Sequence, residues 1–231
     1  MALPLLLLPG MMCDARLFAP QVAAFGAARE VIVPEIGSHD SMAALAAAML
    51  AEAPPRFALG GLSMGGILAM EVLRQAPERV DRLALMDTNP RDEAEEVRAR
   101  RGPQIEAAQA GRHMEIVEEQ MIPNYLAPGA ARPDIVALCC EMARDLGGQV
   151  FVNKSRALRD RPDQQDTLAA ATCRALILCG RHDILCPIER HERMAELMPH
   201  TSFTIVEEAG HLPVLERPEH TNAALARWLE D

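Results

Sequence analysis

Short apolar runs separated by longer helical patterns recur along this chain, and this alternation constrains the fold most strongly. The runs are almost continuously apolar, as is typical of strands buried on both faces of a parallel sheet. Six runs are predicted as strands, at residues 3–8, 29–36, 56–61, 82–87, 174–180 and 202–210. Strands that alternate with helices favour an α/β fold, here a mostly parallel sheet of about six strands flanked by helices.

Four helices are predicted between or after these strands. Ser41 is a favourable N-cap for the alanine-rich stretch that follows it. The stretch 64–76 is apolar on almost every side, which indicates a buried helix. A third helix begins near residue 188, and the last covers 218–231, where Trp228 lies on an apolar face and is interpreted as core packing.

Residues 90–172 break this rhythm, because they are charged, helical in pattern and without a convincing strand. They are predicted to form a helical insert between the fourth and fifth strands. The remaining ranges, 1–89 and 173–231, would then make one α/β core.

The first apolar run, LPLLLL, has two interpretations on its own. An apolar centre suits a signal peptide, but the first positive side chain is Arg16, which follows the run instead of preceding it. The turn Pro9-Gly10 and the bulky residues after it make a poor cleavage site. A short apolar run closed by Pro-Gly is equally typical of a buried strand that enters a turn.

Composition narrows the possible partners. The 231 residues include 33 acidic and 23 basic side chains, a net charge of −10, which argues against nucleic-acid binding. No apolar run is long enough to span a membrane. The six cysteines form no CxxC pair and have no histidine at zinc-ligand spacing, so reduced thiols, a cytoplasmic location and no metal site are predicted.

The most informative stretch is LGGLSMGG, which contains G-x-S-x-G with Ser63 at its centre. It follows a strand pattern and precedes the buried helix, the setting in which a sharp turn projects a serine hydroxyl above a sheet. Gly61 and Gly65 fit that turn because side chains there would collide with the strand and the helix. The alternative is a glycine-rich turn without chemical function.

A serine hydroxyl needs a base to remove its proton. Among the seven histidines, His211 lies in a loop directly after the last predicted strand, and Asp183 lies in the loop after the fifth. Both loops and Ser63 follow carboxyl ends of strands, where open α/β sheets bind ligands. His182 adjoins Asp183 but supplies no carboxylate. For the other five histidines (His39, His113, His191, His200 and His220) a surface or capping role is expected.

The chain contains, in order, the motifs PGMM, GLSMGG, GRHDILCP and AGHLPVLERPE. With these motifs the chain resembles the serine-nucleophile, capped, esterase-like branch of the α/β-hydrolase fold superfamily. The resemblance spans the chain and implies that the first run is a strand, that the insert at 90–172 is a cap and that the usual N-terminal edge strands are missing. It also implies an oxyanion hole made by the backbone N–H groups of Met11 and Met64. Pro9 stands where this family usually has histidine.

The resemblance implies a serine hydrolase that cleaves a carboxylic ester of a small or medium acyl group through an acyl-enzyme, with Ser63, His211 and Asp183 as the triad. No cofactor is needed. A lyase, a C–C hydrolase or an acyltransferase on the same triad stays open, as does a non-catalytic small-molecule receptor. Cys186 lies near Asp183, where packing is its expected role. Monomer and homodimer are both compatible with the sequence.

Overall fold

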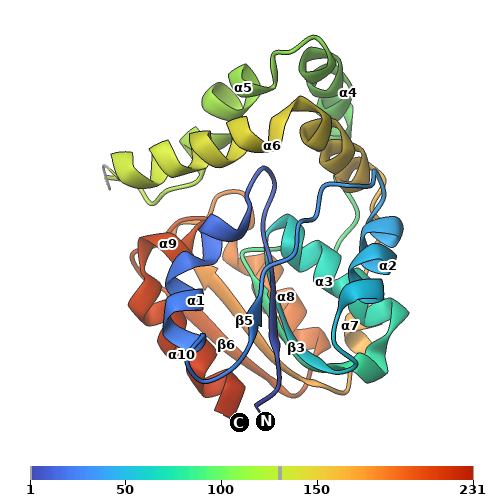
Figure 1. The fold of residues 1–231 in the computed structure, drawn as a ribbon, viewed down its shortest axis with the longest axis vertical. Helices are drawn as coiled ribbons and strands as arrows, with labels where there is room; N and C mark the ends of the chain where they lie inside the picture. The colour runs from blue at the N-terminus through green and yellow to red at the C-terminus, as the bar shows by residue number, and fades with distance from the viewer. Residues whose placement is uncertain (1, 130–131, 231) are drawn as a thin grey trace.

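The computed structural model describes residues 2–129 and 132–230, and its centre is one six-stranded parallel sheet. The strand order is β2-β1-β3-β4-β5-β6 (Figure 1). The strands are β1 (Leu5–Leu8), β2 (Val31–Ile32), β3 (Phe57–Leu62), β4 (Val80–Met86), β5 (Arg174–Gly180) and β6 (Thr201–Val206). The predicted α/β class and number of strands are confirmed, and the first apolar run forms β1.

Strand β1 begins at Leu5 instead of residue 3, and two further strands end earlier than predicted. The edge strand β2 covers two residues, and Pro34 follows closely, without the N–H that would extend the ladder. Strand β6 ends at Val206, and residues 207–210 form the turn that leads to His211. After Ile32 the apolar pattern continues through Val33, but Pro34 ends the pairing. After Val206 the polar pair Glu207 and Glu208 begins the turn.

Helices cover both faces of the sheet. Figure 1 shows α1 and α10 on one side and α2, α3 and α7 on the other. Their bounds are α1 (Ala19–Phe25), α2 (Met42–Glu52), α3 (Met64–Gln75), α7 (Gln165–Ala169), α8 (Ile188–Leu197), α9 (Pro213–Glu216) and α10 (Pro218–Glu230). Ser41 caps α2 as predicted, since its hydroxyl accepts the N–H of Ala44 at 3.3 Å. Trp228 is buried in the core.

The described residues between β4 and β5 form helices and connecting loops, with no strand. Helices α4 (Glu95–Gln109), α5 (His113–Ile116) and α6 (Pro133–Arg159) lie beyond one end of the sheet (Figure 1). This is the carboxyl end, because Lys154 on α6 contacts the loop that follows β1. Gly147 bends α6 with a positive φ of 78°. In the described part of the chain, no helix is long and apolar enough to cross a membrane.

Candidate active site

Ser63 occupies a sharp turn between β3 and α3. Its φ of 55° and ψ of −118° are strained for a residue with a side chain. The backbone holds this conformation from two sides: the Ser63 N–H donates to Met86 O at 2.9 Å, and the Thr88 hydroxyl donates to Ser63 O at 2.7 Å. The strain is therefore maintained by the end of the neighbouring strand β4.

The two glycines of the motif allow the turn to close. A Cβ at Gly61 would overlap the carbonyl oxygen of Gly65, and a Cβ at Gly65 would overlap the carbonyl oxygen of Leu8. Strand β1, the turn and the start of α3 therefore pack backbone against backbone. No side chain fits between them, which is the steric reason for glycine at both positions.

Hydrogen bonds connect three side chains from three separate loops. His211 Nε2 lies 2.9 Å from Ser63 Oγ, and His211 Nδ1 lies 2.8 Å from Asp183 Oδ2. Because an ionised carboxylate only accepts, Nδ1 carries the proton and Nε2 is free to accept the serine proton. The structure thus brings together the three residues that the sequence singled out.

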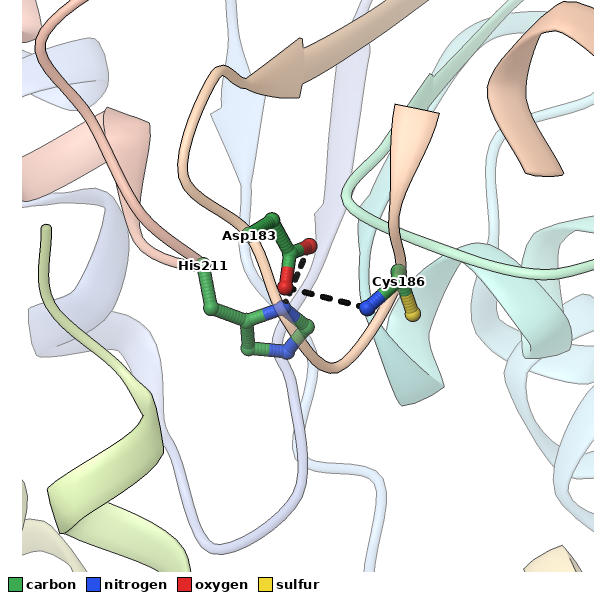
Figure 2. A group of neighbouring side chains, drawn as sticks. All are labelled: Asp183, Cys186 and His211. Carbon is green, nitrogen blue, oxygen red and sulfur yellow. Dashed lines mark hydrogen bonds and ion pairs between the residues drawn. The ribbon is translucent and has the colours of Figure 1, made fainter. Parts of the chain in front are cut away.

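The surroundings of Asp183 keep its carboxylate ionised. Figure 2 shows it between His211 and the backbone of Cys186. Its Oδ1 accepts the N–H groups of Leu185 at 2.8 Å and Cys186 at 3.0 Å. Burial opposes ionisation, but the electrostatic attraction and the hydrogen bond of the His211 Nδ1–H, together with these two N–H groups, lower the Asp183 pKa.

Asp183, Cys186 and His211 also lie close enough together to be considered as metal ligands. The 2.8 Å contact between His211 and Asp183 is a hydrogen bond, and it uses atoms that a metal would need. Burial raises the pKa of the Cys186 thiol, whereas cysteine binds metals as a thiolate. The group is better explained by the hydrogen-bond chain to Ser63.

Asp87, at the end of β4, is a buried acid that the sequence did not single out. Its Oδ1 accepts the N–H of Gly180 at 2.8 Å, and its φ of 46° is strained. Burial and then the charge of Asp183 raise the Asp87 pKa. Burial therefore favours the protonated form of Asp87, whereas the donors around Asp183 favour its ionised form.

Glu216 at the end of α9 holds the loop that carries His211. Its Oε1 accepts the N–H groups of Gly210 at 2.8 Å and Leu212 at 3.2 Å, and its Oε2 accepts the N–H of Ala127 at 2.8 Å. One buried carboxylate thus fixes both neighbours of His211 and ties them to the segment before α6. The only sequence signal for this role is an acid shortly after the histidine.

Glu216→Gln should lower the free energy of unfolding by about 1–3 kcal/mol, because one oxygen that now accepts an N–H becomes an NH₂ group facing it. Urea denaturation measures the change. Glu219→Gln, on the exposed first turn of α10, is the matched control and should leave stability within about 0.5 kcal/mol of the wild type. Equal effects of the two substitutions would contradict the role given to Glu216.

The loop after β1 lies directly against the serine. A Cβ at Gly10 would lie 3.6 Å from Ser63 Cβ. The carbonyl of Gly10 accepts from Lys154 Nζ at 3.4 Å and from the N–H of Cys13 at 3.2 Å. Because C=O and N–H point in opposite directions in a trans peptide, the N–H of Met11 points away from these donors. Met11 and Met64 both line the cavity above Ser63.

Lys154 is a third residue that the sequence did not single out. It is almost fully buried, and its ammonium group also lies 3.4 Å from Cys13 O. Burial lowers the Lys154 pKa to about 8, although the nearby Cys13 thiol and Asp14 carboxylate oppose this shift. A side chain of α6 therefore anchors the loop next to the serine.

His191 does not have the surface or capping role expected for it. It is fully buried on α8, and its Nε2 accepts the N–H of Thr88 at 3.0 Å, while Nδ1 lies 3.3 Å from Pro187 O. Burial lowers the His191 pKa to about 4, so the ring is neutral. The ring thereby fixes the backbone at Thr88, whose hydroxyl donates to Ser63 O and holds the Ser63 turn.

A cavity of about 290 Å³ opens above Ser63 and His211. Its floor comes from the loops at the carboxyl ends of the strands, and its roof from α4 and the segment that follows α5. Apolar side chains from both layers line it, namely Met11, Leu62, Met64, Ile67, Val97, Met121, Leu158, Leu185 and Leu212. The serine hydroxyl is thus reached from a small, partly apolar chamber.

Comparison with known proteins gives relatives along nearly the whole chain. A pimeloyl-[acyl-carrier protein] methyl ester esterase of Vibrio parahaemolyticus is 24% identical over 197 residues, covering 83% of this chain and 77% of that protein. The corresponding esterase of Aliivibrio salmonicida is 27% identical over 205 residues, covering 85% and 77%.

Solved structures agree with this relationship. A thermophilic esterase from Thermogutta terrifontis superposes with a TM-score of 0.92 at 28% identity, covering all of this chain and 90% of the other. An enol-lactonase from Burkholderia xenovorans has the same fold, with a TM-score of 0.89 at 19% identity and coverage of 100% and 92%. The sequence profile of the Alpha/beta hydrolase family matches residues 5–224. The chain therefore belongs to the alpha/beta hydrolase family.

Proposed function

We propose that this protein is a serine esterase that hydrolyses carboxylic esters of small or medium acyl groups. The observation that carries the proposal is the continuous hydrogen-bond chain from Asp183 through His211 to Ser63 at the floor of the cavity. The relatives named as esterases support the same reaction class.

In the proposed reaction, Ser63 Oγ attacks the ester carbonyl while His211 Nε2 takes its proton. Asp183 holds the imidazole in the required tautomer and stabilises its positive charge. His211 then donates the proton to the leaving alcohol. Water, activated by the same histidine, releases the acid and regenerates Ser63.

The N–H groups of Met11 and Met64 are proposed as the oxyanion hole. Met64 is the first residue of α3, so its N–H has no acceptor within the helix and lies at the positive end of the helix dipole. Met11 lies on the loop that packs against Ser63. Two such donors are worth about 10²-fold in rate or more each.

Residues 90–172 are proposed to act as a cap on the core formed by 1–89 and 173–231. The contacts of Lys154 with the loop after β1 and the shared lining of the cavity support this division. The small cavity favours short acyl chains. All six cysteines are free, which supports a reducing compartment such as the cytoplasm.

Hydrolysis of p-nitrophenyl esters from acetate to decanoate tests this proposal. We expect turnover with a preference for the short chains, because a cavity of about 290 Å³ does not enclose a long one. Chain lengths from acetyl to hexanoyl should give the highest kcat/KM. No turnover at any length by the folded protein would contradict an esterase, and a preference for decanoate would contradict the proposed acyl size.

A further inference from the structure

The cavity is lined by more basic than acidic side chains. Four arginines line it, Arg100, Arg101, Arg161 and Arg190, but only one acid, Glu93. The chain as a whole carries a net charge of −10. A basic cavity in an acidic protein is not explained by overall composition.

Glu93 is shared by two of these arginines. Arg161 Nη1 lies 3.1 Å from one carboxylate oxygen, and Arg101 Nη2 lies 3.1 Å from the other. Glu93 and Arg161 are almost fully buried. A single carboxylate therefore compensates one of two guanidinium charges, and a positive charge remains in the cavity wall.

The four arginines differ in how many of their N–H donors are already hydrogen-bonded within the protein. Arg161 also donates from Nε to Arg91 O at 2.9 Å and from Nη2 to Asp92 O at 3.4 Å, so its role is structural. Arg190 donates from Nη1 to Leu185 O at 3.1 Å. Across residues 2–129 and 132–230, Arg190 forms no ion pair and has donors left for a ligand.

Arg100 is the second arginine with unused donors. It donates from Nε to Glu96 O at 3.2 Å, and it too has no acidic partner in the described part of the chain. Arg100 and Arg101 are neighbours on α4, whereas Arg190 lies on the first turn of α8 in the core. The unused donors therefore come from both sides of the cavity.

The arginines also repel one another. Burial, and then the like charges of Arg101 and Arg190, lower the Arg161 pKa, and only Glu93 and Cys186 oppose this. Charges that interact in this way lie within the same partly desolvated region, where water screens them poorly. An anion placed among them would relieve the repulsion and gain charge-assisted hydrogen bonds.

We propose that the substrate is a small ester with a free carboxylate, which Arg190 binds together with Arg100. This inference rests on the proposed esterase function and specifies its substrate class. Leu185 and Cys186 line the same cavity as Ser63, and the carbonyl of Leu185 accepts from Arg190 Nη1. The small volume places the carboxylate only a short chain away from the reacting ester.

Two esters of equal length test the proposal. Monomethyl glutarate ends in a carboxylate, and methyl pentanoate ends in a methyl group. We expect the wild type to prefer monomethyl glutarate by kcat/KM. Arg190→Gln should reduce that preference about tenfold to a hundredfold, since it removes charge-assisted hydrogen bonds to the carboxylate. Arg100→Gln should reduce it by a smaller factor, because Arg100 is more exposed.

Arg193→Gln is the matched control, because Arg193 lies on the same helix outside the cavity and pairs with Gln165 and Glu196. It should leave the preference at the wild-type value. Hydrolysis of both esters with equal kcat/KM would overturn the anionic subsite while leaving the esterase proposal intact. An unchanged preference in Arg190→Gln would overturn the role of that residue.

Calorimetric titration of glutarate into Ser63→Ala tests the subsite without catalysis. Binding that weakens about tenfold when Arg190→Gln is added supports the proposal, even if neither ester is hydrolysed and the esterase assignment fails. Inorganic phosphate is titrated in parallel. Absence of glutarate binding, or tighter binding of phosphate, would overturn the carboxylate assignment.

Discussion

Ser63→Ala should reduce ester hydrolysis by about 10⁴-fold or more, because it removes the nucleophile and leaves only the weak effect of binding and polarisation. The serine hydroxyl contacts His211 Nε2, whereas the turn is held by hydrogen bonds of the Ser63 backbone N–H and C=O. The change is therefore expected in kcat with little loss of stability. Initial rates with p-nitrophenyl acetate measure it.

Ser155→Ala is the matched control for this substitution. Ser155 is also a buried serine, but its hydroxyl has no hydrogen-bond partner among residues 2–129 and 132–230. It should keep wild-type activity to within about twofold, since no interaction is lost. If Ser63→Ala is folded by circular dichroism and still retains a tenth of the wild-type rate, another group is the nucleophile.

Gly65→Ala should lower the free energy of unfolding by about 4 kcal/mol or more, or prevent folding altogether, because the new methyl group would overlap backbone atoms. The atoms in question are the carbonyl groups of Leu8 and Pro9. Neither can rotate away as a flexible side chain would. The strand β1, or the start of α3, would have to move, and Ser63 would move with it. Urea denaturation and the yield of soluble protein measure the effect.

Gly102→Ala serves as the control. Gly102 lies within α4, and apart from its chain neighbours a Cβ there would meet nothing within 4 Å. Alanine should keep the free energy of unfolding within about 1 kcal/mol of the wild type, because its higher helix propensity is offset by crowding of the new Cβ against Pro103. A Gly65→Ala protein as stable as the wild type to within about 1 kcal/mol would refute the steric account of the turn.

The strands and the three central side chains were predictable because their signals are local. A continuous apolar run identifies β3 or β5, and G-x-S-x-G between a strand and a buried helix identifies Ser63. The positions of Asp183 and His211 follow from one topological fact. In a parallel sheet the carboxyl ends of the strands meet at the same edge.

The supporting residues were not predictable, because their partners are distant in sequence or are backbone atoms. Lys154 lies 144 residues from Gly10, and nothing in its local sequence distinguishes it from a solvated lysine. Glu216 binds three backbone N–H groups, which leave no pattern of residue types. His191 lies on an amphipathic helix, and only the packing of α8 shows that its ring is buried.

The basic cavity was also not predictable, because its arginines come from distant parts of the sequence. Arg100 and Arg101 belong to a run of charges that resembles a solvated helix face. Arg190 lies after the Asp183 loop, about ninety positions along the chain from Arg100 and Arg101. Only the fold of α4 over the core places these side chains around one chamber with Ser63.

The most direct test of the central claim is covalent labelling with diethyl p-nitrophenyl phosphate, followed by intact-mass measurement and peptide mapping. A serine activated by His211 should take one diethylphosphoryl group and release p-nitrophenol, with esterase activity lost in proportion. We predict that the group is on Ser63 and that Ser63→Ala is not labelled. Labelling of a different residue, or full loss of esterase activity without a label on Ser63, would contradict the account.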